Sequence, residues 1–361
     1  MKIVYLYSSL AIMGGIERVF VDKMNYLVSH GYMVYMITSD QGQHHVPYLL
    51  DERVHWLDLE IHFHSQYRYR GWRRFQEARR LRQLYHQRLK EKLEEISPDV
   101  LVCTTSQDVR NLLRIKGSIP LIVESHVNFI HPDSWHHHAR TLFNNYWIGK
   151  ANAVVTLTQG DAKNWRHVSR NVHVIPNIVH LNDTGRFSDC TQKRAIFVGR
   201  LVEQKGIPDL IKVWRIVNKR HSDWQLDVYG DGQMESIPEM KLFVHPPTIN
   251  IIEEYINSSM LLMTSVYEPF GLVLPEAMSC GLPVVAFDCP YGPADIIKHE
   301  YSGFLVPNRD INLYADYVCQ LMESPGLRQN MGTEGIKTAQ RYQADRIMPT
   351  WKELFESLIR S

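Results

Sequence analysis

Residues 195–206 read AIFVGRLVEQKG, and this stretch decides the fold. Residues 195–198 form a short apolar run, which is typical of a buried strand, and Gly199 ends that run. Similar apolar runs follow, separated by helix-like stretches. The apolar runs are residues 225–229, 241–244, 260–264, 283–287 and 304–306. This alternation predicts an open parallel α/β sheet in the second half of the chain.

The first half shows the same alternation of short apolar runs and helix-like stretches. Its predicted strands are residues 3–7, 33–38, 100–104, 121–124, 153–157 and 172–175. The polar residues 181–194 lack apolar periodicity, and we expect them to link the two halves. The sequence therefore predicts an α/β protein with two doubly wound parallel sheets.

The composition supports two packed domains. The chain has 361 residues, more than one hydrophobic core usually holds, of which 44% are apolar and 22% charged. No apolar run approaches the roughly 20 residues of a spanning helix, and no signal peptide precedes the first strand, so we expect a cytoplasmic protein. The five cysteines include no C-x-x-C pair, which argues against a disulfide framework and a zinc site.

Positive charge is concentrated in the first half. Residues 1–180 hold 22 Lys and Arg against 16 Asp and Glu, whereas the remainder holds 18 against 23. Residues 67–96 have apolar side chains every three to four positions and predict a basic amphipathic helix. Such a helix is typical of a contact with anionic headgroups or an anionic acceptor; the alternative is an ordinary solvated face. We assign this contact to Arg70, Arg73, Arg74 and Arg80.

A glycine pair follows the first predicted strand. Gly14 and Gly15 precede an apolar-periodic helix, and glycines at such a place let the backbone approach a phosphate at the helix N-terminus. The alternative is a tight turn without a ligand. The chain contains neither G-x-G-x-x-G nor G-x-x-x-x-G-K-[ST], which disfavours NAD enzymes and P-loop ATPases.

Two sequence motifs of the second half are more specific. Arg200 and Lys205 follow a strand end, where two cations can hold a diphosphate leaving group. Residues 268–286 read EPFGLVLPEAMSCGLPVVA, with two glutamates eight positions apart. A helix is expected to open at Gly271, with its first N–H groups able to face a phosphate. Glu276 inside it is suited to pair with ribose hydroxyls.

With these motifs the chain resembles the retaining family 4 glycosyltransferases of the GT-B fold, also described as glycosyl transferases group 1, through nearly its whole length. The resemblance implies two Rossmann-like domains that face a cleft. Residues 1–180, with a crossover helix at 343–361, would bind the acceptor, and residues 181–342 would bind the nucleotide-sugar donor.

The resemblance also implies roles for single residues of the donor domain. Arg200 and Lys205 would neutralise the diphosphate, and Glu276 would hold the ribose. Glu268 would contact hydroxyls of the donor sugar. The remaining donor-site residues would be Gly199, Phe270, Gly271 and Leu272.

In the first domain, the resemblance implies that Gly14 and Gly15 close over the same diphosphate. His126, within the sequence VESH at the end of a predicted strand, matches the family's active-site histidine. It would contact the donor sugar or its phosphate.

The resemblance extends to the substrates. The sequence YGP at residues 291–293, followed by an acidic residue, is similar to galactose or N-acetylgalactosamine transferases of surface-polysaccharide and lipid-linked oligosaccharide pathways. It implies a UDP-sugar donor and a glycan or polyprenyl-diphosphate-linked saccharide as acceptor. We expect an association with the anionic inner face of the cytoplasmic membrane, and no nucleic-acid partner.

No metal or cofactor is expected. The chain has no D-x-D triplet for a divalent cation. The three consecutive histidines at 136–138 would point in different directions on one helix and could not jointly coordinate an ion.

Two alternatives stay open. One is a different nucleotide-sugar enzyme on the same architecture, of the epimerase or phosphorylase type. The other is a non-catalytic module that binds an anionic ligand, although such a module does not explain the paired glutamates beside a phosphate site.

Overall fold

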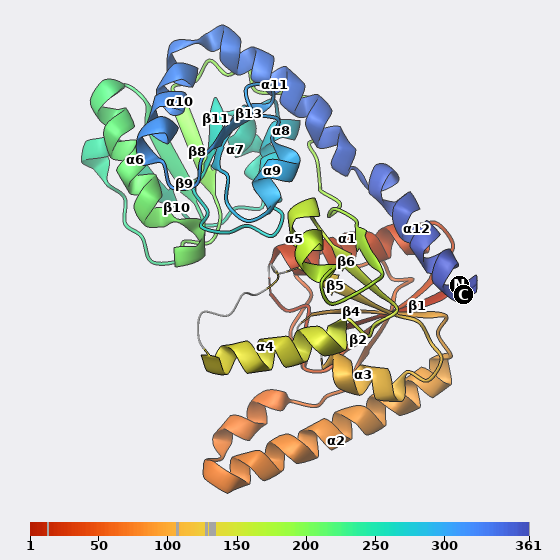
Figure 1. Cartoon of the computed structure of the whole chain (residues 1–361). Helices are drawn as coiled ribbons and strands as arrows, with labels where there is room; N and C mark the ends of the chain where they lie inside the picture. Colours follow the sequence, from red (N-terminus) through yellow and green to blue (C-terminus); the bar gives the residue numbers. More distant parts are fainter. Residues whose placement is uncertain (13, 106–107, 127–128, 130–134, 361) are drawn as a thin grey trace. The chain divides into compact units, whose positions relative to one another are not determined.

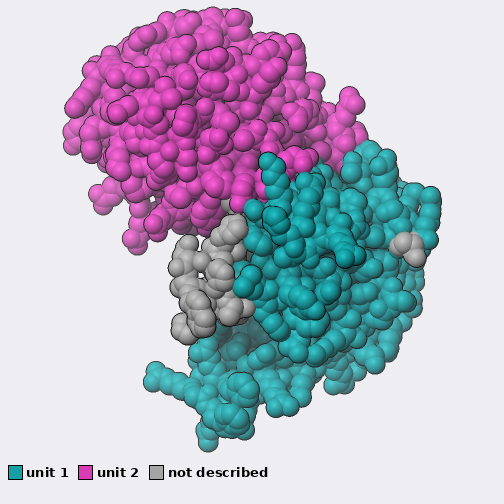
Figure 2. Space-filling model, viewed as in Figure 1, with its two compact units in different colours: residues 1–157, 162–178, 348–361 teal, residues 158–161, 179–347 magenta. Residues whose placement is uncertain are grey.

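The computed structural model describes residues 1–12, 14–105, 108–126, 129 and 135–360, and for residues 135–140 the backbone alone. The described chain divides into two compact units (Figure 2). The first unit comprises residues 1–157, 162–178 and 348–361, and the second comprises residues 158–161 and 179–347. Each unit contains one parallel sheet with helices packed against it (Figure 1).

The first unit is built on a seven-stranded parallel sheet in the order β3-β2-β1-β4-β5-β6-β7. The strands are β1 (Lys2–Tyr7), β2 (Met33–Thr38), β3 (His55–Asp58), β4 (Val100–Thr104), β5 (Leu121–Ser125), β6 (Ala153–Thr156) and β7 (Val172–Val174). The chain order reverses between β1 and β4, which is where open α/β sheets bind their ligands. Strand β3 is not predicted from the sequence, because this short edge strand is too exposed to form a buried apolar run.

Helices cover both faces of this sheet. They are α1 (Gly15–Ser29), η1 (Phe63–Arg68), α2 (Gly71–Ile96), α3 (Val109–Ile115) and α4 (Trp135–Ile148); α5 (Gln159–Trp165) and α12 (Ala344–Arg360) have residues in both units. Val4 of β1 packs in one core cluster with Leu89 of α2. Tyr5, the next residue of the strand, contacts the ring of Phe20 on α1, with centroids 5.8 Å apart. Because neighbouring strand residues point to opposite faces, α1 and α2 lie on opposite sides of the sheet.

Only part of the apolar stripe of α2 is core. Leu81 and Leu93 are buried, but Trp72 is 70% exposed and Phe75 51% exposed. A helix of 26 residues is about 39 Å long, whereas a six-residue strand spans about 20 Å. The helix is therefore longer than the strands of the sheet, and its first turns extend beyond the sheet and do not pack on it.

The second unit has a six-stranded parallel sheet in the order β10-β9-β8-β11-β12-β13. The strands are β8 (Arg194–Val198), β9 (Gln225–Tyr229), β10 (Leu242–His245), β11 (Met260–Met263), β12 (Val284–Phe287) and β13 (Gly303–Val306). Chain order reverses between β8 and β11. The prediction of an α/β protein with two Rossmann-like sheets is confirmed, and no end of a predicted strand differs from the observed one by more than one residue.

Helices also surround the second sheet. They are η2 (Glu203–Lys205), α6 (Ile207–Arg220), η3 (Pro238–Met240), α7 (Ile251–Ile256), α8 (Val273–Ser279), α9 (Gly292–Ile296), α10 (Ile311–Glu323), α11 (Pro325–Ala339) and η4 (Gln340–Tyr342). Tyr314 of α10 is fully buried and joins two strands: its hydroxyl donates to the Val285 carbonyl at 2.6 Å and accepts from the Met263 N–H at 2.9 Å. This contact fixes α10 against β11 and β12.

Two chain segments lie in a unit other than the one their position suggests. Residues 158–161 belong to the second unit, where the Gln159 N–H donates to Asp295 at 2.6 Å. Residues 348–360 of α12 belong to the first unit, where the Lys23 ammonium lies 4.4 Å from the centre of the Trp351 ring. Within the described residues, no helix has both the length and the apolarity that a membrane span requires.

Candidate functional site

A half-buried ion pair lies where chain order reverses in the second sheet. Lys205, in the turn after β8, donates from Nζ to Glu268 Oε2 in the loop after β11. The Ser265 hydroxyl donates to the same oxygen at 3.1 Å. The exposed fractions are 17% for the Lys205 side chain and 9% for that of Glu268. The structure thus brings two of the predicted residues, Lys205 and Glu268, into contact at the carboxyl ends of β8 and β11.

A glycine makes this approach of the two loops possible. Gly206 follows Lys205 with a positive φ of 67°, and a Cβ there would lie 1.9 Å from the Thr264 carbonyl oxygen. The Thr264 hydroxyl in turn donates to the Lys205 carbonyl at 3.1 Å. Only glycine fits both the backbone conformation and the space, so it fixes the Lys205 turn against the end of β11. Gly199 lies on the other side, where a Cβ would be 3.6 Å from the Lys205 side chain.

Arg200 is arranged differently from Lys205. It directly follows Gly199, its side chain is exposed, and its guanidinium has no hydrogen bond or ion pair with any residue that the structure describes. One predicted cation is therefore held by a carboxylate, and the other is available to an anion from solution.

The other predicted donor-site residues lie around the start of α8. Gly271 has a positive φ of 93°, and a Cβ there would lie 3.2 Å from the Cγ of Glu268. Leu272 caps α8, and Glu276, in the first turn of this helix, is 7% exposed. Phe270 is only 3% exposed, and its ring packs edge-on against Tyr342 at 5.3 Å. Its side chain is therefore part of the packed interior of the second unit.

In the first unit, His126 belongs to a buried charged group that the sequence did not reveal. Its Nε2 lies 2.9 Å from Glu124 Oε2, and the other oxygen of Glu124 accepts from Lys23 Nζ at 2.6 Å. Burial would raise the pKa of the Glu124 carboxyl, but the charge of Lys23 and the hydrogen bond with His126 lower it below its usual range. Because an ionised carboxylate only accepts, His126 donates from Nε2, and its Nδ1 in the neutral form is an acceptor.

Two sequence signals pointed to this group. Glu124 is a charged residue inside a strand that is otherwise apolar. Lys23 occupies a position between Val19 and Leu27 on the buried face of α1. A buried charge nearly always has a partner, so each residue could have been expected to have one, although the sequence does not show which residue it is.

The glycine turn of the first unit contains a carboxyl group. Glu17, in the first turn of α1, is 6% exposed and accepts a hydrogen bond of 3.0 Å from the Tyr7 hydroxyl. A Cβ at Gly14 would lie 2.3 Å from Glu17 Oε2, so the glycine makes room for this side chain. Gly15 is the first residue of α1. A phosphate approaching Gly14 and Gly15 would therefore meet an acidic group beside the helix N-terminus.

The basic residues Arg70, Arg73, Arg74 and Arg80 lie at the beginning of α2. The rings of Trp72 and Phe75 stack at 5.2 Å, and the Arg74 guanidinium lies 4.5 Å from the Tyr67 ring centre. Arg80 pairs with Glu77, whereas Arg73 has no partner among the described residues. This end of the helix is an exposed surface of aromatic rings and arginines.

The cysteines offer no nucleophile. All five are buried, and burial followed by the charge of Glu268 raises the pKa of the Cys289 thiol to about 12. A thiol with such a pKa stays protonated at neutral pH, and the thiolate is the reactive form.

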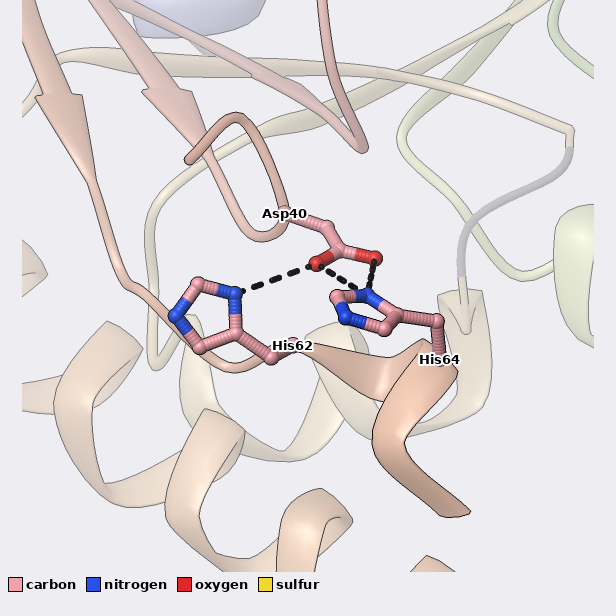
Figure 3. Close-up of side chains that lie close together, drawn as sticks. All are labelled: Asp40, His62 and His64. Carbon is pink, nitrogen blue, oxygen red and sulfur yellow. Dashed lines mark hydrogen bonds and ion pairs between the residues drawn. The ribbon is translucent and has the colours of Figure 1, made fainter. Parts of the chain in front are cut away.

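A cluster of side chains that could hold a metal ion lies at the surface of the first unit (Figure 3). Asp40 Oδ1 is 3.2 Å from His64 Nδ1 and 3.6 Å from His62 Nδ1. Two imidazoles and a carboxylate suit zinc and other transition metals. Among the described residues, this is the one group of three side chains placed to bind a metal ion. The side chains of the three histidines at 136–138 are not among those described. Protonated histidines paired with a carboxylate would give the same arrangement.

Family models match both halves of the chain. The model "Glycosyltransferase Family 4" matches residues 13–183, and "Glycosyl transferases group 1" matches residues 184–338. The chain belongs to the family 4 glycosyltransferases. The predicted resemblance is therefore confirmed.

Relatives and solved structures agree with this assignment. The chain is 34% identical over 227 residues to the amylovoran biosynthesis glycosyltransferase AmsD of Erwinia amylovora, a match that covers 58% of this chain and 63% of that one. It is 29% identical over 248 residues to the poly(ribitol-phosphate) alpha-N-acetylglucosaminyltransferase of Staphylococcus aureus, covering 65% of this chain and 50% of that one. The chain thus spans about half to two thirds of the length of these relatives.

A solved structure of an S. aureus TarM mutant in complex with fondaparinux, alpha-GlcNAc-glycerol and UDP has a TM-score of 0.79 at 16% identity. The match covers 98% of this chain and 99% of that chain. Such a likeness confirms the GT-B fold.

Proposed function

We propose that this protein transfers a hexose or N-acetylhexosamine from a UDP-sugar to a saccharide acceptor, with retention of the anomeric configuration and without a metal ion. The observation that carries the proposal is the arrangement of Arg200 and Lys205 after β8, one exposed and one held by Glu268 at the point where the sheet reverses.

The donor diphosphate would bind to the second unit. Arg200 can donate a pair of hydrogen bonds to it, and Lys205 has N–H donors beyond the one that Glu268 accepts. Both cations would stabilise the negative charge that grows on the diphosphate as its bond to the sugar breaks. Donors that are already in place contribute several kcal/mol to such a step. Glu268 would accept hydrogen bonds from sugar hydroxyls, and Glu276 would accept them from the ribose.

The acceptor hydroxyl would attack from the face on which the diphosphate departs, and a phosphate oxygen would take its proton. This route needs no protein nucleophile, in agreement with the protonated thiols. In the first unit, Glu124 accepts from His126 Nε2, which in the neutral tautomer would leave Nδ1 as an acceptor for a sugar hydroxyl.

The UDP donor is supported by the UDP in the TarM complex, and the galactose or N-acetylgalactosamine by the YGP sequence at residues 291–293. A glycan acceptor is supported by the names of the relatives, which refer to amylovoran biosynthesis and to poly(ribitol-phosphate). A polyprenyl-diphosphate-linked acceptor is proposed from the family resemblance of the sequence. The exposed rings and arginines at the start of α2 support an association with the anionic inner face of the cytoplasmic membrane.

The proposal is tested by incubating the protein with UDP-galactose or UDP-N-acetylgalactosamine, with and without polyprenyl-diphosphate-linked N-acetylglucosamine. We expect UDP release that requires the acceptor, and a product whose new linkage keeps the donor's α configuration by NMR. An epimerase would change the sugar without releasing UDP. A β-linked product, or turnover by Arg200→Ala at the wild-type rate, would contradict the proposal.

A further inference from the structure

An open cavity of about 750 Å³ lies at the surface of the first unit, among α2, α3 and α4. These three helices are neighbours in Figure 1, on the side of the sheet away from α1 and α12. The volume is within the range of about 300–1,000 Å³ that is usual for small-molecule sites. None of the donor-site residues, and neither His126 nor Gly14, lines it.

The walls of the cavity carry an excess of positive charge. Its arginines have no carboxylate partner in the part of the chain that the structure describes. Asp108 is the one carboxylate among the lining residues, and it caps α3 by accepting from the Asn111 N–H at 3.2 Å. The lining arginines are Arg79, Arg82, Arg110 and Arg114.

Three polar atoms that belong to lining residues are buried and have no hydrogen-bond partner among the described residues. They are Arg110 Nε, Trp147 Nε1 and His86 Nε2. Native structures leave few buried polar atoms unpaired, so three on one cavity indicate that something else supplies the partner. The arginine and tryptophan atoms can only donate, and the missing partner must therefore offer acceptor oxygens.

Aromatic rings hold one of these donors in place. The Arg110 guanidinium lies 5.4 Å from the centre of the Phe143 ring and 5.5 Å from that of Trp147. Such stacking limits the rotation of the arginine and leaves its edge to bind an anion. Phe143 is 48% exposed, so its ring also offers an apolar surface to a ligand.

We propose that this cavity binds a phosphate-bearing saccharide unit. The phosphate oxygens accept from the arginines and from the unpaired donors of Arg110 and Trp147, and the sugar ring packs against Phe143. Binding of the anion follows from the cavity alone, whereas the saccharide part rests on the proposed function. The site would hold an anionic segment of the acceptor apart from the residues that act on the donor.

The test is calorimetric titration of the full chain with glucose 1-phosphate, inorganic phosphate and glucose. We expect glucose 1-phosphate to bind more tightly than inorganic phosphate, and glucose alone to give no signal. Arg110→Met should weaken glucose 1-phosphate at least about tenfold, because it removes charge-assisted hydrogen bonds. Trp147→Phe keeps a ring but removes the donor, and should weaken binding by about threefold.

Two further variants distinguish binding in this cavity from binding at arginines elsewhere in the protein. Arg166→Met removes an exposed arginine of the same unit that lies outside the cavity, and should leave binding unchanged. Arg200→Ala should also leave it unchanged, even if the proposed transfer activity fails. Thermal unfolding of each variant checks that the chain is folded.

The proposal is overturned if folded Arg110→Met binds glucose 1-phosphate as the wild type does, or if Arg200→Ala abolishes the signal. It is also overturned if a single-stranded RNA oligonucleotide, and not glucose 1-phosphate, binds in an Arg110-dependent way. Failure of the titration with every phosphate probe contradicts it as well.

Discussion

Each of the two sheets carries a lysine–glutamate pair near the point where its chain order reverses, and the two pairs differ in access to solvent. The Lys205–Glu268 side chains are 17% and 9% exposed, whereas those of Lys23 and Glu124 are 3% and 2% exposed. The rings of Phe20 and Trp351 lie 5.1 and 4.4 Å from the Lys23 ammonium. We propose that the same two residue types serve a ligand in one unit, whereas in the other they hold His126, and that the burial of the pair makes the difference.

The largest effect is expected at the accessible pair. Lys205→Ala should lower turnover about a thousandfold, equivalent to roughly 4 kcal/mol, since it removes a preformed cation from the departing diphosphate. Its free energy of unfolding should fall less than when the Lys23–Glu124 pair is broken, because the Lys205 and Glu268 side chains are 17% and 9% exposed and water can reach the remaining carboxylate. Initial rates and urea denaturation of the same preparation measure both quantities. A large loss of stability with normal turnover would show that the Lys205–Glu268 pair has a structural role and does not bind the diphosphate.

The opposite pattern is expected at the buried pair. Glu124→Gln should lower the free energy of unfolding by about 3 kcal/mol, because it leaves the Lys23 charge buried without its partner. Urea denaturation at neutral pH gives this number, with Glu77→Gln, which breaks an exposed pair with Arg80, as the matched control. A Glu124 variant as stable as that control would contradict the assignment.

The pH dependence of stability sharpens this point. The pKa of Glu124 is lower in the folded protein than the ordinary value of 4.5, so its contribution is present above pH 4.5 and is lost as pH falls through the folded pKa. The difference in unfolding free energy between wild type and Glu124→Gln should therefore be constant at neutral pH and shrink below about pH 4.5. Urea denaturation curves at several pH values measure this difference. A difference in unfolding free energy that stays constant below pH 4.5 would contradict the lowered pKa of Glu124.

A smaller effect is expected at Arg73, which has no carboxylate partner in the described part of the chain. Arg73→Met should weaken binding to phosphatidylglycerol vesicles about fivefold, near 1 kcal/mol for one exposed charge. Vesicle co-sedimentation at low and high salt measures it, and Arg166→Met serves as a charge-matched control. Equal binding by both variants would remove the support for a membrane contact at the start of α2.

No effect is expected from metal removal. Turnover in excess EDTA should stay within about twofold of the untreated rate, because Arg200 and Lys205 are proposed to take the place of a divalent cation. Re-addition of Mg²⁺ or Zn²⁺ is the control. Loss of activity that Zn²⁺ restores would contradict the metal-free mechanism and would favour a zinc site at Asp40, His62 and His64.

The sequence predicted the features that depend on local pattern. Buried parallel strands appear as short apolar runs, and the motif around Lys205 and Glu268 could be placed at strand ends, because strand ends follow directly from those runs. Strand β3 was missed since an edge strand is exposed and has no such run. Trp72 and Phe75 continue the periodicity of α2, but the periodicity does not show where the sheet beneath it ends.

Contacts between distant residues were not accessible from the sequence. Lys23 and Glu124 are 101 positions apart, and only the packing of α1 on β5 brings them together. Lys205 and Glu268 were both selected for a ligand, but nothing in the motif showed that they also bind each other. The carboxyl group of Glu17 was overlooked for a similar reason, because its place beside Gly14 depends on the rotamer that Tyr7 stabilises.

The central claim is that the second unit holds the nucleotide diphosphate through Arg200 and Lys205, and titration of UDP by calorimetry tests it most directly. Lys212, whose exposed side chain pairs with Asp209 in the same unit, supplies the control variant Lys212→Ala. We predict that Arg200→Ala and Lys205→Ala each weaken UDP at least about tenfold, whereas Lys212→Ala leaves it unchanged. Equal UDP affinity in all three variants and the wild type would contradict the account.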